Sequence, residues 1–216
     1  FSIVSYTGTG SAGTIKHGLS TAPKMIIQKN RDETQPWWTY VESIGAGGQL
    51  RLNGTNAEGS DGATLWNSTA PTSSVFSVGD NTGTNGSSDK CIAYCFADVK
   101  GYSKVSGSYV GNGNVNGSYI HLGFSPSLVI QKEYGASGEY WMMKDNKRET
   151  GNQTDANLYP NASNAEGDTN GIDLLSNGFK CRTSGAGSNG SGKLYIYMAW
   201  ASNPFVTSTG VPTTAR

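Results

Sequence analysis

The sequence predicts an all-β protein made of two tandem, closely docked antiparallel β-sandwich units of a jelly-roll-like kind, related by an internal repeat. Its apolar segments are short, rich in β-branched and aromatic residues, and separated by clusters of Gly, Asn and Ser. No segment of helix length shows helical periodicity. Gly, Ser, Thr and Asn make up 94 of the 216 residues, beside five Trp, eleven Tyr and six Phe. This composition is typical of a folded, turn-rich β protein, because disordered chains are poor in aromatic residues.

The internal repeat consists of two copies that fill nearly the whole chain. The matching segments are residues 5–10 with 108–113, 23–29 with 126–132, 37–38 with 140–141, 56–59 with 164–167, and 85–87 with 189–191. Most of these matches have an offset of 103 residues, and loops of different length change it locally. We therefore predict one β-sandwich repeat over residues 1–101, a second over residues 102–205, and an extended C-terminal arm over residues 206–216.

The strands are expected in the same order in both copies. They are predicted around residues 1–4, 25–27, 37–38 and 91–97, and again around 102–105, 128–130, 140–141 and 195–200. Residues 25–27 and 128–130 are continuous apolar runs, which is typical of central strands. Residues 195–200 alternate, so that Ile196, Met198 and Trp200 share one face.

The connector between the two copies and the start of the first copy lead to two further expectations. Residues 98–107 join the copies without Pro or a long flexible run, so we expect little relative motion. The first copy opens directly in strand-like residues, whereas the second follows a strand. We therefore expect further polypeptide before Phe1.

The charge balance limits the classes of partner, and the spacing of the cysteines indicates that they form no disulfide. Sixteen basic residues balance sixteen acidic ones, so we expect neither a nucleic-acid partner nor attraction to an anionic membrane. The apolar runs are too short to span a bilayer, and membrane insertion is not expected. Cys91 and Cys95 would lie about 13 Å apart along one strand, too far for a disulfide. With Cys181 unpaired, we expect three reduced thiols.

Two glycine-rich segments resemble nucleotide-binding motifs without the context that such motifs need. Residues 8–13 match G-x-G-x-x-G, but no helical pattern follows to meet a pyrophosphate. Residues 187–193 resemble a phosphate-binding loop, but Leu194 stands where a Ser or Thr would bind magnesium. We predict that the first is a hairpin loop, that the second is a turn, and that no cofactor is bound.

The remaining chemistry-bearing residues do not form a catalytic or metal-binding motif. His17 and His121 have no Cys, His or carboxylate at ligand spacing, and G-x-S-x-G is missing. Glu58 and Glu166 are repeat-equivalent, but both lie in Asn-Ala-Glu-Gly, which is typical of a turn. Residues 112–117 resemble a calcium loop without its carboxylates. We predict no enzymatic activity, no catalytic residue and no metal.

Aromatic residues are the best candidates for binding. If Trp38 and Trp141 face the core, strand alternation sends Trp37 and Tyr140 to the opposite face, where rings could stack on sugars. The alternative interpretation is that this face packs against the other unit or a neighbouring subunit. Trp37 and Tyr140 are therefore predicted as contacts for a glycan or a protein partner.

Several segments taken together resemble a tandem domain of tailed-bacteriophage structural proteins, marine phages included. These segments are residues 1–10, 17–19, 22–27, 69–76, 92–97 and 101–104, followed in the second copy by 111–113, 158–161, 179–180, 195–200 and 203–205. The resemblance covers essentially the whole chain. It implies tail-fibre or other virion surface proteins, supplies no catalytic residues, and implies preceding copies. Cys95 fits the pattern of this family and supports a free thiol.

The expected function is therefore that of a noncatalytic virion surface structural protein, a fibre, appendage or decoration that acts in particle assembly, host attachment or both. We expect a homo-oligomer, a trimer, that contacts other virion proteins and host surface glycans. It would assemble in the host bacterial cytoplasm and be exposed on the particle. The alternatives are a lectin-like carbohydrate-binding module for host recognition and a tail-associated depolymerase.

Overall fold

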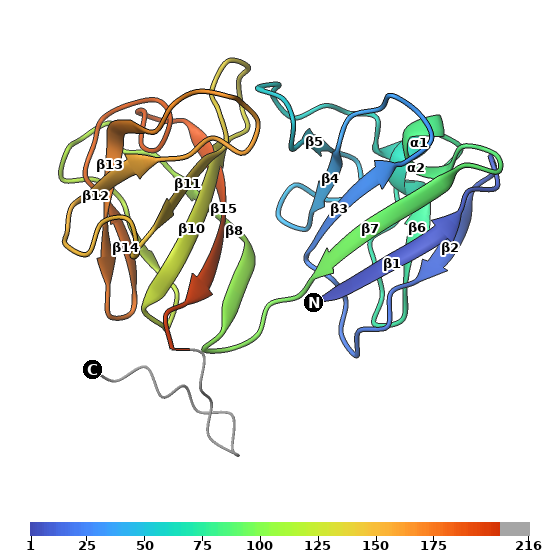
Figure 1. Cartoon of the computed structure of the whole chain (residues 1–216), viewed down its shortest axis with the longest axis horizontal. Helices are drawn as coiled ribbons and strands as arrows, with labels where there is room; N and C mark the ends of the chain where they lie inside the picture. The colour runs from blue at the N-terminus through green and yellow to red at the C-terminus, as the bar shows by residue number, and fades with distance from the viewer. Residues whose placement is uncertain (204–216) are drawn as a thin grey trace. The chain divides into compact units, whose positions relative to one another are not determined.

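The computed structural model describes residues 1–203 and confirms a nearly all-β protein with antiparallel sheets. The chain divides into two compact units, Phe1–Ala97 and Asp98–Arg216, called unit 1 and unit 2 (Figure 1). The predicted arm over residues 206–216 lies outside the described residues. Within residues 1–203, neither helix has the length and apolar character needed to cross a membrane.

Unit 1 is built on a five-stranded antiparallel sheet with the order β1-β7-β3-β4-β5. Its strands are β1 (Ser2–Thr7), β7 (Lys90–Phe96), β3 (Met25–Asn30), β4 (Trp38–Val41) and β5 (Leu50–Arg51). The pair β2 (Gly13–Lys16) and β6 (Val75–Val78), with helices α1 (Gly62–Trp66) and α2 (Thr82–Asn85), completes the unit. Leu65 and Trp66 of α1 pack with Phe76 in the core.

Unit 2 contains two four-stranded antiparallel sheets in the described residues. The first has the order β11-β10-β15-β8, with β11 (Met142–Asp145), β10 (Pro126–Glu133), β15 (Leu194–Ala201) and β8 (Ser103–Val110). The second has the order β12-β13-β14-β9, with β12 (Thr154–Asn157), β13 (Gly167–Leu175), β14 (Gly178–Cys181) and β9 (Tyr119–His121). Phe179 and Ile172 of the second sheet pack with Val129 of the first.

The main sheets of the two units share one strand order, since β1-β7-β3-β4 corresponds to β8-β15-β10-β11. The pair β2-β6 likewise corresponds to β9-β14. The strands β3 and β10 are both central, as their continuous apolar runs predict. In β15, Tyr197 and Ala199 of one predicted face pack in the core of unit 2, but Ile196 and Met198 of the other face are buried as well, and only Trp200 on that face is partly exposed.

The loop over residues 8–13 corrects one expectation. It was expected to close a hairpin, but β1 pairs with β7 and β2 pairs with β6, so the loop joins strands of different sheets. The corresponding loop in unit 2 joins β8 to β9, which also belong to different sheets. Alternating apolar residues indicate that strands flank a turn, but they do not indicate whether those strands pair with each other.

Candidate functional site

The predicted contact residue Trp37 lies just before β4 and is half-buried. Its ring stacks on that of Tyr94 in β7, with ring centroids 6.3 Å apart and planes inclined at 29°. Its backbone N–H donates to Asn53 Oδ1 at 2.9 Å. The next residue, Trp38, is buried in the core of unit 1, so the two indoles point in different directions.

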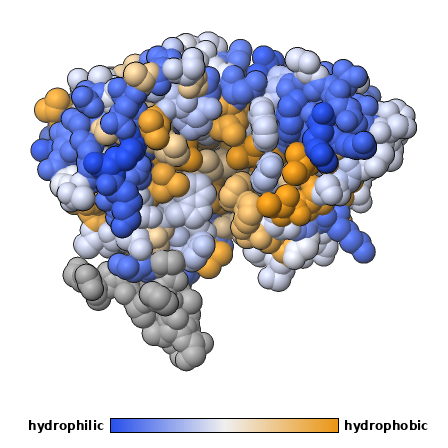
Figure 2. Space-filling view, in the orientation of Figure 1, coloured by the Kyte–Doolittle hydropathy of each residue, from blue (hydrophilic) through white to orange (hydrophobic). Residues whose placement is uncertain are grey.

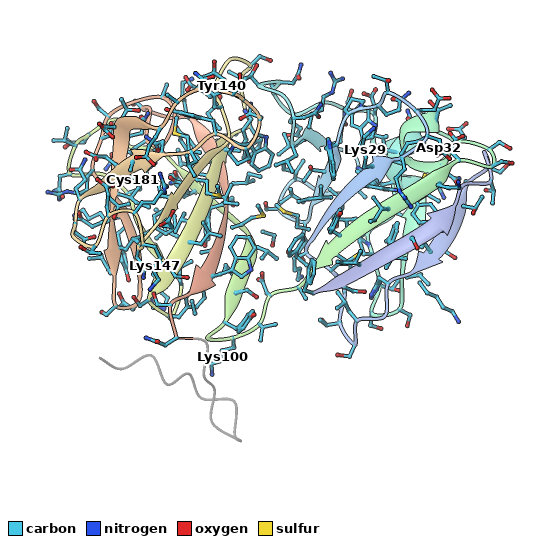
Figure 3. The ribbon with its side chains drawn as sticks, viewed as in Figure 1. Lys29, Asp32, Lys100, Tyr140, Lys147 and Cys181 are labelled. Carbon is cyan, nitrogen blue, oxygen red and sulfur yellow. The ribbon has the colours of Figure 1, made fainter. Side chains whose placement is uncertain are left out.

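The predicted contact residue Tyr140 lies on the loop before β11 and is half-buried (Figure 3). Its ring meets that of Tyr159 edge-on, with centroids 5.2 Å apart and an interplanar angle of 61°. Trp37 and Tyr140 thus each have an aromatic partner in their own unit.

The strand register shows that Tyr140 does not take the place of Trp37. In unit 1, Ile26 pairs with Tyr40, whereas in unit 2 the corresponding Val129 pairs with Lys144. The equivalent of Trp37 is therefore Trp141, whose N–H donates to Asn161 Oδ1 at 3.0 Å in the same way. Trp141 is only 1% exposed. One extra residue between β10 and β11 shifts the pairing, so the expected duplication of the Trp37 position in Tyr140 is wrong.

An apolar strip lies on the outer face of unit 1, and we define it by Phe1, Ile3, Tyr94 and Phe96. Phe1 is 65% exposed and Ile3 57% exposed. The rings of Phe1 and Phe96 lie 4.8 Å apart, and Ile3 pairs with Tyr94 across β1 and β7. Figure 2 shows hydrophobic surface over these two strands. Contiguous apolar side chains of this kind on the surface make the strip a candidate interaction surface.

The glycine-rich motifs belong to a buried asparagine clamp that occurs in both units. In unit 1, Asn85 Nδ2 donates to the carbonyl oxygens of Ser11 and Gly79, both at 2.7 Å, and its Oδ1 accepts from Thr9 N at 2.8 Å. In unit 2, Asn189 Nδ2 donates to the carbonyl oxygens of Asn114 at 2.9 Å and Thr183 at 2.8 Å, and its Oδ1 accepts from Asn112 N at 3.0 Å.

The first glycine of each loop is required because the backbones nearly touch at the clamp. A Cβ at Gly8 would lie 2.1 Å from the carbonyl oxygen of Gly86, and one at Gly111 would lie 2.2 Å from that of Gly190. A β-strand follows each loop, β2 in unit 1 and β9 in unit 2. The motif residues therefore hold chain segments together.

The histidines and glutamates that could have formed a reactive site are dispersed. His17 is buried, with Nε2 3.0 Å from Thr72 O and Nδ1 accepting from Leu19 N at 3.1 Å. His121 is on the surface beside Tyr119. Burial raises the pKa of Glu58, while Glu166 pairs with Arg148. Within residues 1–203 there is no cluster of three or more His, Cys, Asp or Glu that could hold a metal ion.

Two surface grooves lie away from the predicted contact residues. One, of about 420 Å³ in unit 1, is lined by Gly10, Ser11, Ala12, Ala63, Thr64, Asn67, Gly79 and Asp80. Another, of about 210 Å³ in unit 2, is lined by Ser125, Pro126, Asn146, Glu149, Thr150, Gly151, Asn152, Thr154 and Leu174. Neither Trp37 nor Tyr140 lines these grooves, so a ring that stacks on a sugar would do so on open surface.

The three cysteines are free and buried. Burial raises the pKa of Cys95 to about 12 and that of Cys181 to about 11. Cys181 lies at the end of β14 (Figure 3). Thiols with such pKa values stay protonated at neutral pH, so they act as small apolar side chains.

Two fully buried lysines in unit 2 escaped the sequence analysis. Lys132 Nζ donates to the backbone oxygen of Glu133, and Lys144 Nζ donates to Asn157 Oδ1. Burial lowers the pKa of Lys132 to about 8 and that of Lys144 to about 7. In the sequence, the one indication that Lys144 faces inward is its position two residues after the apolar Met142. This indication can be used only once the strand register is known.

A protein-family model described as a domain of unknown function, DUF7483, matches residues 1–204. This one match spans both units. Comparisons with curated proteins and with solved structures find no match. Because the model covers nearly the whole chain, the chain belongs to the DUF7483 family.

Proposed function

We propose that the chain is a noncatalytic structural segment of a virion surface protein of a tailed bacteriophage, a fibre, appendage or decoration used in particle assembly, host attachment or both. The observation that carries this proposal is the repetition of one main sheet and one asparagine clamp. A rigid unit built twice supplies repeated contacts, which sum through avidity when the chain is also multiplied by symmetry. The segment-by-segment resemblance to phage structural proteins points to the virion.

We further infer that units 1 and 2 are tandem copies of one jelly-roll-like β-sandwich. The shared strand order, the equivalent pairs β2-β6 and β9-β14, and the matching core positions Phe76 and Phe179 support this inference. A structure of a longer polypeptide should contain further copies with the same strand order.

The apolar strip supports a homo-oligomer, which we propose to be a trimer. Sedimentation velocity of this chain should give about three times its mass of 22.7 kDa. An Ile3→Asp change should weaken the assembly, because it places a charge in the strip. Val115→Asp is the matched control: Val115 is 64% exposed but lies outside the strip. A monomer at all concentrations would argue against the proposed assembly.

The location on the particle has a separate test. Antibodies raised against this chain and labelled with gold should decorate intact phage particles of the strain that encodes it. Labelling of lysate debris but not of particles would contradict a virion role.

A lectin-like module is the second candidate, favoured by the stacked pair of Trp37 and Tyr94. If it is correct, a glycan array should show binding that Trp37→Ala abolishes. Tyr102→Ala is the control, because Tyr102 is 46% exposed and lies outside the stacked pair. The predicted contribution of Tyr140 has its own variant, Tyr140→Ala. An array without binding removes this candidate and leaves the structural role standing.

A further inference from the structure

A lysine amine and a side-chain amide meet in the interior of unit 2. Lys144 on β11 lies opposite the core residue Val129, and its side chain is fully buried. Its Nζ donates to Oδ1 of Asn157 on β12, which is also fully buried. The two groups therefore face each other where water has little access.

The amide of Asn157 has only one orientation that satisfies its neighbours. Its Nδ2 donates to the backbone oxygens of Asp155 at 2.9 Å and Gly167 at 3.3 Å, and to both the backbone oxygen and the hydroxyl of Thr169. A carbonyl oxygen turned to this side would face three backbone oxygens, none of which can donate a hydrogen bond. Oδ1 is therefore held toward Lys144, and with it the electrophilic Cγ.

The surroundings favour a neutral amine. Burial lowers the pKa of Lys144 from 10.5 to about 7, so at neutral pH a large fraction of the side chain carries a free lone pair. Arg148 acts in the same direction, whereas the carboxyl groups of Asp155 and Glu149 favour the charged form.

Two carboxyl groups, those of Asp155 and Glu149, act electrostatically on the amine of Lys144. Glu149 Oε2 accepts from the backbone N–H groups of Asp155 and Ala156 at 2.7 and 2.8 Å, which lowers the pKa of Glu149. Burial and this neighbouring carboxylate raise the pKa of Asp155. Of the two, Asp155 therefore holds a proton more readily.

We propose that Lys144 and Asn157 form an intramolecular isopeptide bond. Nζ of Lys144 attacks Cγ of Asn157, a C–N bond forms, and Nζ gives up a proton. The bond from Cγ to Nδ2 breaks, and Nδ2 leaves with that proton as ammonia. An amine and a carboxamide become a secondary amide and ammonia, so nothing is oxidised or reduced. We assign the proton transfers to the carboxyl pair of Asp155 and Glu149.

Unit 1 supplies a natural contrast. Tyr40 takes the position of Lys144, as the strand pairing shows. Gln49 takes that of Asn157. Gln49 forms a β-bridge with Gly59, and Asn157 pairs with Gly167, the glycine that matches Gly59 in the repeat. Both ends of the Gln49 amide are occupied by Asp61, through Oδ2 at 2.9 Å and N–H at 2.8 Å. The buried amide is thus present in both units, but only unit 2 places an amine against it.

The test is the intact mass of the full chain after purification and incubation at neutral pH. The measured mass should be lower than the sequence mass by one ammonia. Tryptic digestion should leave the bond after Lys144 uncut and give a branched peptide that joins residues 133–147 to residues 149–180. The full sequence mass, with normal cleavage after Lys144, would overturn the proposal.

Variants separate the cross-link from a purely structural polar contact. Lys144→Met and Asn157→Ala should each keep their full sequence mass, and Asn157→Asp should lose one water, because a carboxylic acid gives the same amide. Asp155→Asn should slow the loss of ammonia at least tenfold, as expected when a proton-transfer group is removed. Lys132→Met is the matched control: Lys132 is equally buried but donates to a backbone oxygen, so ammonia should still be lost. Loss of ammonia from Lys144→Met would contradict the assignment.

Discussion

Units 1 and 2 share their main sheet but differ in what covers it. Between β4 and β6, unit 1 has the short strand β5 and the helix α1, whereas between β11 and β14, unit 2 has the strands β12 and β13. Leu65 and Trp66 of α1 fill the core in one case, and Ile172 of β13 contributes to it in the other. One main sheet thus accepts either a helix or strands as cover, provided that apolar volume is supplied.

The same compensation occurs within the main sheets. Ala93 pairs with Val4 in unit 1, while at the corresponding place Tyr197 pairs with Gly107 in unit 2. The Tyr197 ring lies over Gly107, where a Cβ would be 1.9 Å from it. A large and a small residue have exchanged strands, so side-chain volume is preserved across the pair rather than at each position.

Removal of the clamp asparagine should have the largest effect on stability, and the effect should be similar in the two units. Asn85→Ala and Asn189→Ala should each lower the free energy of unfolding of their own unit by about 4 kcal/mol, because several buried backbone groups lose their partners. Hydrogen exchange of peptides from each unit measures the two effects separately. Asn116→Ala, at an exposed asparagine, should change stability by less than about 0.5 kcal/mol. If only one of the two variants loses much stability, the two clamps are not equivalent.

The exchange of a large and a small residue between paired strands can be tested by introducing the combination of unit 1 into unit 2. Gly107→Val should destabilise unit 2 by about 3 kcal/mol, because the new side chain overlaps the Tyr197 ring. Adding Tyr197→Ala recreates the combination of unit 1 and should restore at least about 1 kcal/mol, as measured by denaturant titration. If the second change only adds to the loss, volume is not conserved across this pair.

The buried amine of unit 2 should make its stability depend on pH once it is freed. In Asn157→Ala, Lys144 keeps its amine, with a folded pKa of about 7 against 10.5 when unfolded. Between these values the unfolded state binds more protons, so the free energy of unfolding should rise with pH, by roughly 2 kcal/mol from pH 7 to about pH 8.5. The double variant with Lys144→Met should lack this rise. Lys132 titrates in both variants, so its contribution cancels from the difference between their stabilities. Equal dependence of stability on pH in the two variants would contradict the burial of Lys144.

The smallest effect concerns one turn residue. Ser88 has a φ of 67° where unit 2 has Gly192 with a φ of 71°, and both N–H groups donate to the first glycine of the clamp loop at 2.9 Å. Ser88→Gly should stabilise unit 1, and Gly192→Ser should destabilise unit 2, each by about 1 kcal/mol. Thermal unfolding of the two variants checks the signs. A loss of stability in Ser88→Gly would show that the hydroxyl matters more than the backbone conformation.

Local chemistry made several features of the fold predictable. The main strands were recognisable from their apolar runs, and the paired glycine segments from their recurrence. The helix α1 was not recognisable, because its five residues are too few to show helical periodicity. The equivalence of Trp37 with Trp141 was missed as well, since one residue added in a loop leaves no trace in the apolar pattern of the flanking strands.

By itself, the sequence determined where the chain turns and where it is extended. Glycine, asparagine and alternating apolar residues act over a few neighbours, so their preferences can be seen without the fold. Only the tertiary structure decided that Lys144 meets Asn157, that Asn85 and Asn189 close their loops, and that Trp141 is buried. Those contacts join segments that are distant in the chain, and they depend on strand register, which shifts by one residue with any loop insertion.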